Sequence, residues 1–168
     1  MVVFTLLYFV ISNKWLGKWE LYENSRYGFS LEYPTNWKLG DQSTNNDGRE
    51  FSAPGGGTTC RAYGFSNALT GAGGEPQTLD EFITWLTGPE SEEKIIEKTK
   101  TTLSGKKAVY FHSSFNEGEK DAVYSLGKET GIGLYCTYKN TAEKEKNKAV
   151  FDHMRENLKI NLDLDTGI

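Results

Sequence analysis

YENSRYGFSLEYPTNW, residues 22–37, is the stretch that decides the fold of this 168-residue chain. Phe29, Leu31 and Tyr33 alternate with polar residues, which is the period of a β-strand with one buried face. Pro34 cannot donate a hydrogen bond to a neighbouring strand, and the turn-forming residues after it bring the closing tryptophan back against the strand. The stretch therefore predicts an early strand on which the rest of the chain packs.

Composition and charge bound the class of protein. A chain of 168 residues has the length of a single domain with one substantial core. Nine Tyr, nine Phe and 18 Gly favour a sheet-rich protein with many turns over a helical bundle. The net charge is −4 and the sequence has no basic stripe, so we expect no nucleic-acid partner.

Further strands are predicted from short alternating or β-branched runs. They cover residues 50–52, 58–66, 94–102, 107–115, 122–128 and 132–139. The last four are joined by short turns, at Gly105, 116–120 and 130–131, and connections this short predict antiparallel neighbours. Three glycines at 55–57 predict a hairpin tip, and the alternation at 160–164 predicts either an edge strand or a fraying tail.

Two helices are predicted. Residues 78–87 begin with Thr78 and Glu81, which form a capping box, and end at a Gly-Pro pair. Residues 142–158 form the second helix, with Thr141 as its cap. Each helix has one apolar face, made of Leu79, Phe82, Ile83 and Leu86 in the first and Val150, Phe151, Met154 and Leu158 in the second. These faces are expected to cover a sheet.

The N-terminal sequence has features of a targeting or membrane-anchoring segment. Residues 1–11, MVVFTLLYFVI, are apolar and uncharged, with the length of a signal-peptide core and short of the roughly 20 residues that cross a membrane. We interpret residues 1–17 as a truncated signal or membrane anchor, 18–162 as the domain and 163–168 as a tail. The alternative is that the apolar segment is a buried first strand or helix.

Two other features bear on the compartment. Cys60 and Cys136 form either one disulfide, if the domain is exported, or two small buried side chains. Trp15, Trp19 and Tyr22 lie between the apolar segment and the domain. They fit either an aromatic belt at a membrane interface or the core packing of a first strand.

The opening stretch resembles the N-terminal signature of PsbP-like domains, in which a Gly-Phe pair, an extended strand, a Tyr-Pro and a tryptophan follow one another. The matching positions are Tyr27, Gly28, Phe29, Tyr33, Pro34 and Trp37. The capped helix at 78–87, the Gly-Lys-Lys-Ala turn at 105–108 and the apolar run at 158–160 extend the resemblance. It implies an α+β fold, an α/β/α sandwich in which a largely antiparallel β-sheet is flanked by helices on both faces.

What the resemblance implies about function is a binding scaffold without a common active site. The family includes an extrinsic, lumenal subunit of the photosynthetic oxygen-evolving complex and bacterial envelope proteins or lipoproteins. This chain differs from the lipoprotein members because no cysteine follows its apolar N-terminus.

His112 is the best candidate for chemistry. It lies within the predicted strand at 107–115, on the face of Tyr110, and it fits either a general base or a satisfied side chain at a sheet surface. His153 falls on the polar face of the second helix and is expected to be solvated. Two histidines without H-x-x-H spacing do not indicate a transition-metal site.

Residues 43–48, STNNDG, match part of a calcium-binding loop through Asn45 and Asp47. The first ligand would be Ser43 and the twelfth position is Pro54, so a hairpin turn at Asp47 explains the pattern better. The sequence contains no phosphate-loop, dinucleotide-binding or serine-hydrolase motif.

These observations predict a non-catalytic binding or scaffold domain of the cell envelope, outside the cytoplasm. We expect no catalytic, cofactor-binding or metal-binding residue and no cofactor. The expected partners are a protein or small molecule and, through the N-terminal segment, a membrane. The glycine-rich loop at 67–77 is a candidate binding element. The alternatives are an enzyme with a pocket around His112 and a soluble cytoplasmic regulatory protein.

Overall fold

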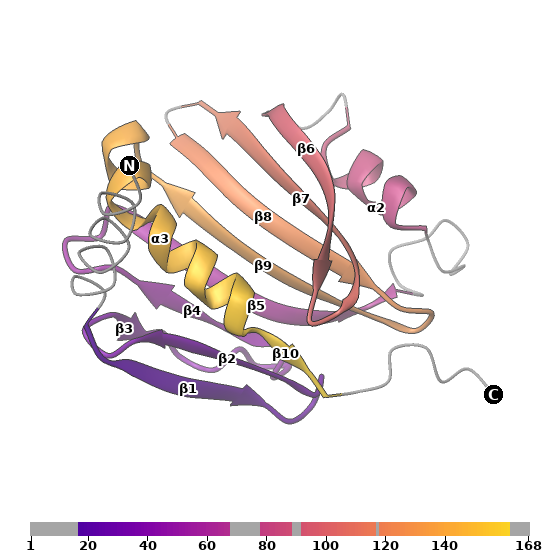
Figure 1. Ribbon diagram of the computed structural model, residues 1–168, viewed down its shortest axis with the longest axis horizontal. Helices are drawn as coiled ribbons and strands as arrows, with labels where there is room; N and C mark the ends of the chain where they lie inside the picture. Colours follow the sequence, from indigo (N-terminus) through magenta and orange to yellow (C-terminus); the bar gives the residue numbers. More distant parts are fainter. Residues whose placement is uncertain (1–16, 68–77, 89–91, 117, 162–168) are drawn as a thin grey trace, which may run out of the picture.

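The computed structural model describes residues 17–67, 78–88, 92–116 and 118–161. The elements in chain order are β1 (Trp19–Asn24), β2 (Phe29–Pro34), β3 (Lys38–Leu39), β4 (Gly48–Ser52), β5 (Thr58–Ser66), α2 (Leu79–Leu86), β6 (Glu93–Leu103), β7 (Lys106–Phe115), β8 (Gly118–Leu126), β9 (Thr130–Tyr138), α3 (Thr141–Asn157) and β10 (Lys159–Ile160). They form a seven-stranded sheet of order β3-β4-β5-β9-β8-β7-β6 and a three-stranded sheet of order β1-β2-β10, with antiparallel pairing throughout (Figure 1).

The opening stretch forms the hairpin β1–β2, with β2 at the centre of the small sheet. The side chains of Phe29, Leu31 and Tyr33 are buried, as the alternation predicts. Gly28 has a φ of 58°, a conformation that glycine adopts without strain, and it closes the turn between the two strands. The Trp37 amide donates to the Pro34 carbonyl at 2.9 Å and so turns the chain back, as predicted.

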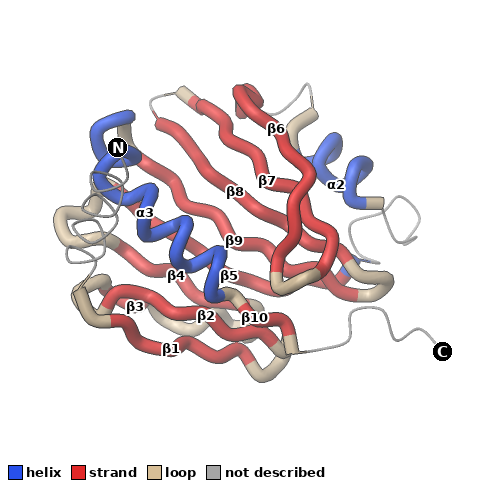
Figure 2. Tube along the Cα trace, in the orientation of Figure 1, coloured by secondary structure: helices blue, strands red, loops and turns tan. Residues whose placement is uncertain are grey.

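The main core lies between α3, the small sheet and one face of the large sheet, which we call the α3 face. Val150, Phe151 and Met154 of α3 pack there with buried side chains of both sheets, including Leu31 of β2 and Leu134 of β9. Figure 2 shows α3 lying over the large sheet, next to β2 and β10 of the small sheet. The predicted apolar face of this helix is confirmed.

The cap of α3 differs from the prediction. Asn140 is the N-cap, and its side chain accepts a hydrogen bond from the Glu143 amide at 2.9 Å. Thr141 is the first helical residue, and its hydroxyl instead donates to the Glu119 carboxylate on β8. Both residue types cap helices, so the tertiary contact of Thr141 decides which of the two does so.

Helix α2 covers a smaller core on the large sheet. Phe82 and Ile83 are buried against Val109 and Phe111 of β7 and Tyr124 of β8. These β7 residues alternate with Ala108 and Tyr110, which belong to the main core. The capping box of Thr78 and Glu81 is present as predicted.

The α+β class and the largely antiparallel sheet are confirmed, whereas helical layers flanking one sheet on both faces are not what the structure shows. On one face of the large sheet, the layer that contains α3 also contains the three-stranded sheet. The smaller core is covered by α2 alone, a helix of eight residues. The reason is that β1, which we did not predict as a strand, pairs with β2 and removes it from the large sheet.

The predicted meander is confirmed as β6 to β9, although β8 begins at Gly118, within the segment predicted as a turn. The hairpin tip at 55–57 is also confirmed, with φ values of 91° at Gly55 and 72° at Gly56. After α3, Lys159–Ile160 form β10 at the edge of β2. Of residues 160–164, for which an edge strand or a fraying tail was predicted, only 160 and 161 are described, so beyond Ile160 the two alternatives stay open.

Cys60 and Cys136 lie directly opposite each other on β5 and β9 and form a disulfide across 76 residues of sequence. Both side chains are fully buried in the main core. The bridge predicted as one of two alternatives is therefore present.

The proposed signal or anchor lies outside the described residues except at its last position, as does most of the proposed tail, so the domain division stays a prediction. In the part of the chain that the structure describes, no helix has the length and apolar character to cross a bilayer. Tyr22 of β1 is buried in the main core, while Trp15 lies outside the described residues.

Candidate functional site

An open groove of about 890 Å³ lies at the end of the large sheet where β5 begins and β9 ends. Its described lining comes from the β4–β5 hairpin tip, the β7–β8 turn and those strand ends: Gly56, Gly57, Thr58, Thr59, Phe115, Asn116, Gly118, Thr137, Tyr138 and Lys139. Lys139 donates its amide to the Gly57 carbonyl at 2.9 Å, which extends the β5–β9 ladder past its last residue pair. The groove therefore has a backbone frame that the sheet holds in place.

The groove has the chemistry of a binding site for a polar group. The Thr59 hydroxyl, the Asn116 amide and the Lys139 ammonium supply donors, whereas the hydroxyls of Thr58 and Thr137 are engaged within the protein, and Phe115 supplies an apolar ring. Its described lining holds no histidine, cysteine or carboxylate side chain.

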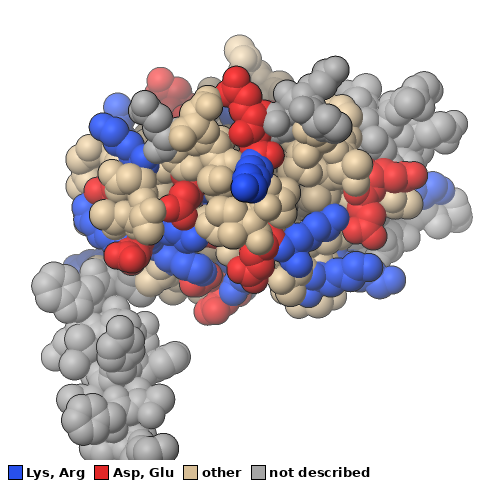
Figure 3. Space-filling model, turned by 90° about the horizontal axis from the view of Figure 1, so that it is seen from above, with Lys and Arg blue, Asp and Glu red and all other residues tan. Residues whose placement is uncertain are grey.

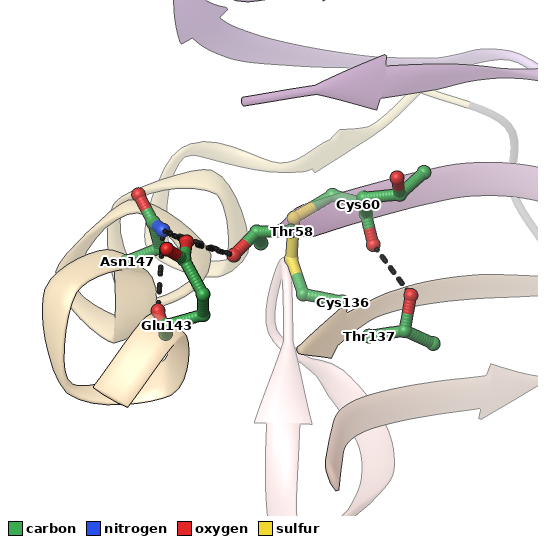
Figure 4. The surroundings of a disulfide bond; sticks show 7 residues. Thr58, Cys60, Cys136, Thr137, Glu143 and Asn147 are labelled. Carbon is green, nitrogen blue, oxygen red and sulfur yellow. Dashed lines mark hydrogen bonds between the residues drawn. A yellow bond between two sulfur atoms is a disulfide. The ribbon is translucent and has the colours of Figure 1, made fainter. Parts of the chain in front are cut away.

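One wall of the groove is tied to α3 (Figure 4). Asn147 donates through Nδ2 to Thr58 Oγ1 at 2.9 Å and to Glu143 Oε2 at 3.1 Å. A Cβ at Gly57 would lie 2.5 Å from the Glu143 side chain, so a larger residue there would require that side chain to move. On the other side of the disulfide, Thr137 Oγ1 donates to the Thr59 carbonyl at 3.2 Å. These contacts hold the two threonine-bearing strands rigidly.

His112 lies beside the groove but does not line it. The side chain is 7% exposed and sits on the α3 face between two carboxylates. Its Nε2 is 3.2 Å from Glu119 Oε2, and its Nδ1 is 3.2 Å from Asp121 Oδ1. Lys144 of α3 closes the cluster, with Nζ 2.8 Å from His112 Nε2 and 3.2 Å from Glu119 Oε2.

Both ring nitrogens of His112 have partners. Nδ1 is 3.1 Å from the Lys120 carbonyl and 3.2 Å from Lys144 Nζ. Nε2 lies 2.8 Å from the same ammonium. The ring is thus held as part of a buried polar network beneath α3, in the arrangement that the satisfied-side-chain alternative predicts.

The network also sets the ionisation of its neighbours. The hydrogen bond from Thr141, with the Lys144 ammonium beside it, lowers the pKa of Glu119 below its usual value. Burial, followed by the hydrogen bond to Asp121, raises the pKa of the Tyr110 hydroxyl, which donates to Asp121 Oδ1 at 2.8 Å. Burial and the charge of Asp121 likewise raise the pKa of Tyr138. Both tyrosines therefore stay protonated around neutral pH.

The sequence did not predict the partners of His112. The hairpin register could have found one of them, because Phe115 pairs with Gly118 and the same register places Asp121 opposite His112. Lys144 comes from α3, and no local pattern indicates where a helix residue will reach.

In the partial calcium-loop motif at 43–48, the Asp47 carboxylate is engaged by neighbouring side chains. Asp47 Oδ1 accepts from Ser43 Oγ at 2.6 Å and from Arg61 Nη2 at 3.2 Å, and Asn45 Nδ2 donates to Asp47 Oδ2 at 3.3 Å. Although burial opposes it, the Ser43 hydrogen bond and the Arg61 charge hold the pKa of Asp47 below its usual value. Among the described residues, no cluster of three His, Cys, Asp or Glu side chains suits a metal ion.

The expectation that His153 is solvated is wrong. Its ring stacks on Trp19 of β1, with centroids 3.6 Å apart and planes 15° from parallel, and Nε2 lies 2.9 Å from Glu32 Oε2 on β2. The small sheet packs against α3 closely enough to cover a residue on the helix's polar side. His153 thus connects α3 with β1 and β2, and it does not belong to the cluster around His112.

Other predicted site features are dispersed. Of the loop at 67–77, only Asn67 is described, and its side chain donates to the Gly127 carbonyl at 2.9 Å. The face of the molecule in Figure 3 carries acidic and basic side chains intermixed over its described surface.

No protein-family model matches the chain, and no curated protein matches its sequence. Solved structures do match it. The chain is similar to cyanobacterial PsbP (CyanoP) from Synechocystis sp. PCC 6803, with a TM-score of 0.60 and 12% identity over 86% of this chain and 93% of that chain. It is also similar to LpqN of Mycobacterium tuberculosis, described as involved in cell envelope biogenesis, with a TM-score of 0.57 and 14% identity over 86% and 91% of the two chains.

A third similar structure is the Ran-binding protein Mog1p of Saccharomyces cerevisiae, with a TM-score of 0.55 and 8% identity over 89% of this chain and 97% of that chain. The predicted PsbP-like fold is confirmed by these matches. Identities this low show a shared fold, and the three proteins with this fold have different descriptions, so function has to be argued from the site.

Proposed function

We propose that this chain is a non-catalytic binding domain of the cell envelope, outside the cytoplasm, with the groove at the end of the large sheet as the place where a protein or small molecule binds. Residues 1–17 hold it at the membrane. The description of LpqN as an envelope protein supports this assignment by analogy of fold.

The observation that carries the proposal is the Cys60–Cys136 disulfide in the centre of the sheet. Buried disulfides persist in oxidising compartments and are rare in the cytosol. This bond therefore favours an extracytoplasmic location over the alternative of a soluble cytoplasmic regulatory protein.

The environment of His112 supports a role without catalysis. A general base must reach the proton that it abstracts, and His112 is covered by Lys144 and lies off the described lining of the groove. The adjacent carboxylates are the one feature that favours the enzyme alternative. They are engaged by Thr141 and Tyr110, as expected of a structural network.

Thiol labelling tests the address. The full chain is isolated from the cells that make it, unfolded without reductant and treated with a maleimide. We expect no label until reductant is added, and we expect protease added to intact spheroplasts to degrade the chain. Two labelled thiols before reduction, together with protease protection, would overturn the extracytoplasmic assignment.

Site-specific photo-crosslinking in those cells tests the groove. A photoreactive amino acid replaces Asn116 or Lys139, both exposed at the groove, and Glu23 on β1 serves as the control position. The expected result is one discrete adduct from both groove positions and none from position 23. Equal adducts at all three positions would contradict the groove as the binding site.

A further inference from the structure

Strand β6 is the longer of the two outer strands of the large sheet, and in the described part of the chain no strand pairs with its outer side. It has 11 residues and ends the strand order, whereas the strand at the other end, β3, has two. A free edge presents unpaired backbone groups that can pair with another strand. Ile96, near the middle of β6, is 58% exposed and is one of three large apolar side chains so exposed in the described residues.

The charges of β6 are self-complementary. The segment Glu93–Lys98 reads EKIIEK, and its reverse has the opposite charge at every charged position. If two copies of it pair antiparallel about a two-fold axis at the isoleucines, Lys94 faces the partner's Glu97 and Glu93 faces the partner's Lys98. Unlike charges directly opposite each other stabilise antiparallel pairs.

A bulge makes this register geometrically allowed. In a regular strand, residues 94 and 97 would point to opposite faces of the sheet, and they could not face each other across a two-fold axis. The register of β6 shifts by one residue between Ile95 and Glu97, so that Lys94 pairs with Ser114 and Glu97 pairs with His112. Ser114 and His112 lie on the same face of β7, and therefore Lys94 and Glu97 share a face.

The inner charge pair is accessible to a partner. Lys94 and Glu97 are exposed, and neither has an ion pair in the described part of the chain, where Glu97 Oε1 accepts one hydrogen bond at 3.4 Å from Thr99 Oγ1 of the same strand. Glu93 and Lys98 are held within the chain by Lys120 and Asp80. Selectivity thus rests on Lys94 and Glu97, with the two isoleucines between them.

The register with a two-fold axis at Thr99 is unfavourable. It would place Lys98 opposite the partner's Lys100, and like charges in that position destabilise the pair. Charges on an edge strand ordinarily prevent pairing with unrelated strands. The charges of β6 therefore disfavour pairing with unrelated strands, whereas their order along the strand is complementary to that of a second copy.

We propose that two copies of this chain associate through β6, antiparallel and two-fold symmetric about Ile95 and Ile96, so that the two large sheets become one continuous sheet. The contact is isologous, with each Lys94 against the partner's Glu97. This surface is separate from the groove, and its test does not depend on the groove's function.

Charge-reversed variants of the full chain test the register by sedimentation equilibrium over a range of concentrations. For the single variants K94E and E97K, we expect the dissociation constant of the dimer to rise at least about tenfold, because both symmetric ion pairs become like-charge contacts. The double variant K94E/E97K restores opposite charges and is expected to dimerise like the wild type. The controls K38E and E23K change the charge equally at exposed positions of β3 and β1 and should leave dimerisation unchanged.

Mixing the two single variants gives the sharpest result. A K94E chain carries two glutamates at these positions and an E97K chain carries two lysines, so a mixed dimer has two correct ion pairs. We expect the mixture to associate although neither variant does so by itself. A wild type that stays monomeric at all concentrations, or a mixture that stays monomeric, would overturn the proposal.

Discussion

The environment of Glu119 shows how the contacts of one carboxylate affect stability. Thr141 and Lys144 of α3 both contact its carboxylate, and they lower its pKa from the ordinary value of 4.5. A carboxyl group whose pKa is lower in the folded protein contributes stability above its unfolded pKa, and this contribution is lost as the pH falls through the folded pKa. The contact therefore stabilises the domain at neutral pH and not in acid.

Glu119→Gln is expected to unfold at a lower urea concentration than the wild type at pH 7. The difference should shrink steadily as the pH falls below 4.5, because the wild-type carboxyl group then takes up a proton as well. Urea titrations at several pH values measure this. Glu23→Gln, exposed on β1, is the control. A difference that stays constant down to about pH 2 would show that the charge is not the cause.

The disulfide leads to a second prediction at the residue scale. Replacing both Cys60 and Cys136 with alanine should lower the free energy of unfolding by about 2–4 kcal/mol, because the bond restricts the unfolded chain across a long loop. Denaturant titrations with and without reductant provide the control. Reductant should destabilise the wild type and leave the double variant unchanged, and an equal response of both would contradict the role of the bond.

At the scale of elements, α2 owes its start to one side chain. Thr78 accepts from the Glu81 amide, and Glu81 in return accepts from the Thr78 amide at 2.8 Å. Thr78→Ala should lower the free energy of unfolding by about 1 kcal/mol. Thr84→Ala in the same helix is the matched control, since Thr84 is exposed in mid-helix and alanine is the better helix former. Denaturant titrations of both variants measure this, and equal losses would refute the capping role.

Elements with a strong local pattern could be predicted from the sequence. The period-2 alternation gave β2 its buried face, and the capping box with its apolar spacing gave α2. Strand β1 has no such pattern, because its exposed Leu21 interrupts the apolar alternation and its pairing with β2 is what makes it a strand. The division into two sheets followed from that pairing and was missed with it.

The candidate site shows the same division. His112 could be placed on its strand face from the sequence, and its carboxylate neighbours required the register of β7 and β8. The groove combines a hairpin tip, a turn and two strand ends, which are distant in sequence. Such a site depends on tertiary arrangement, and no short motif reveals it.

At the scale of the whole molecule, two cores of unequal size divide the domain. The main core joins both sheets and α3, whereas α2 contributes only Phe82 and Ile83 as buried residues to the smaller one. Regions with few buried contacts open at lower free energy than the global unfolding. We expect α2 to open independently and the two sheets to unfold together.

Native-state hydrogen exchange measures this difference. The amides of α2 should exchange through local opening, while those of β2 and β9 should share one high protection that follows global stability. The Thr78→Ala variant should speed exchange in α2 more than in β9. If β2 exchanged as fast as α2, the small sheet would be a separate unit and the single main core would be contradicted.

The bond between β5 and β9 also changes the topology of the chain. Residues 60–136, which include α2, β6, β7 and β8, form a covalent ring from which the two ends of the protein emerge. A single peptide-bond cleavage within that ring opens it without releasing a fragment. The domain can therefore be cut once by a protease in this region and remain one molecule until the sulfurs are reduced.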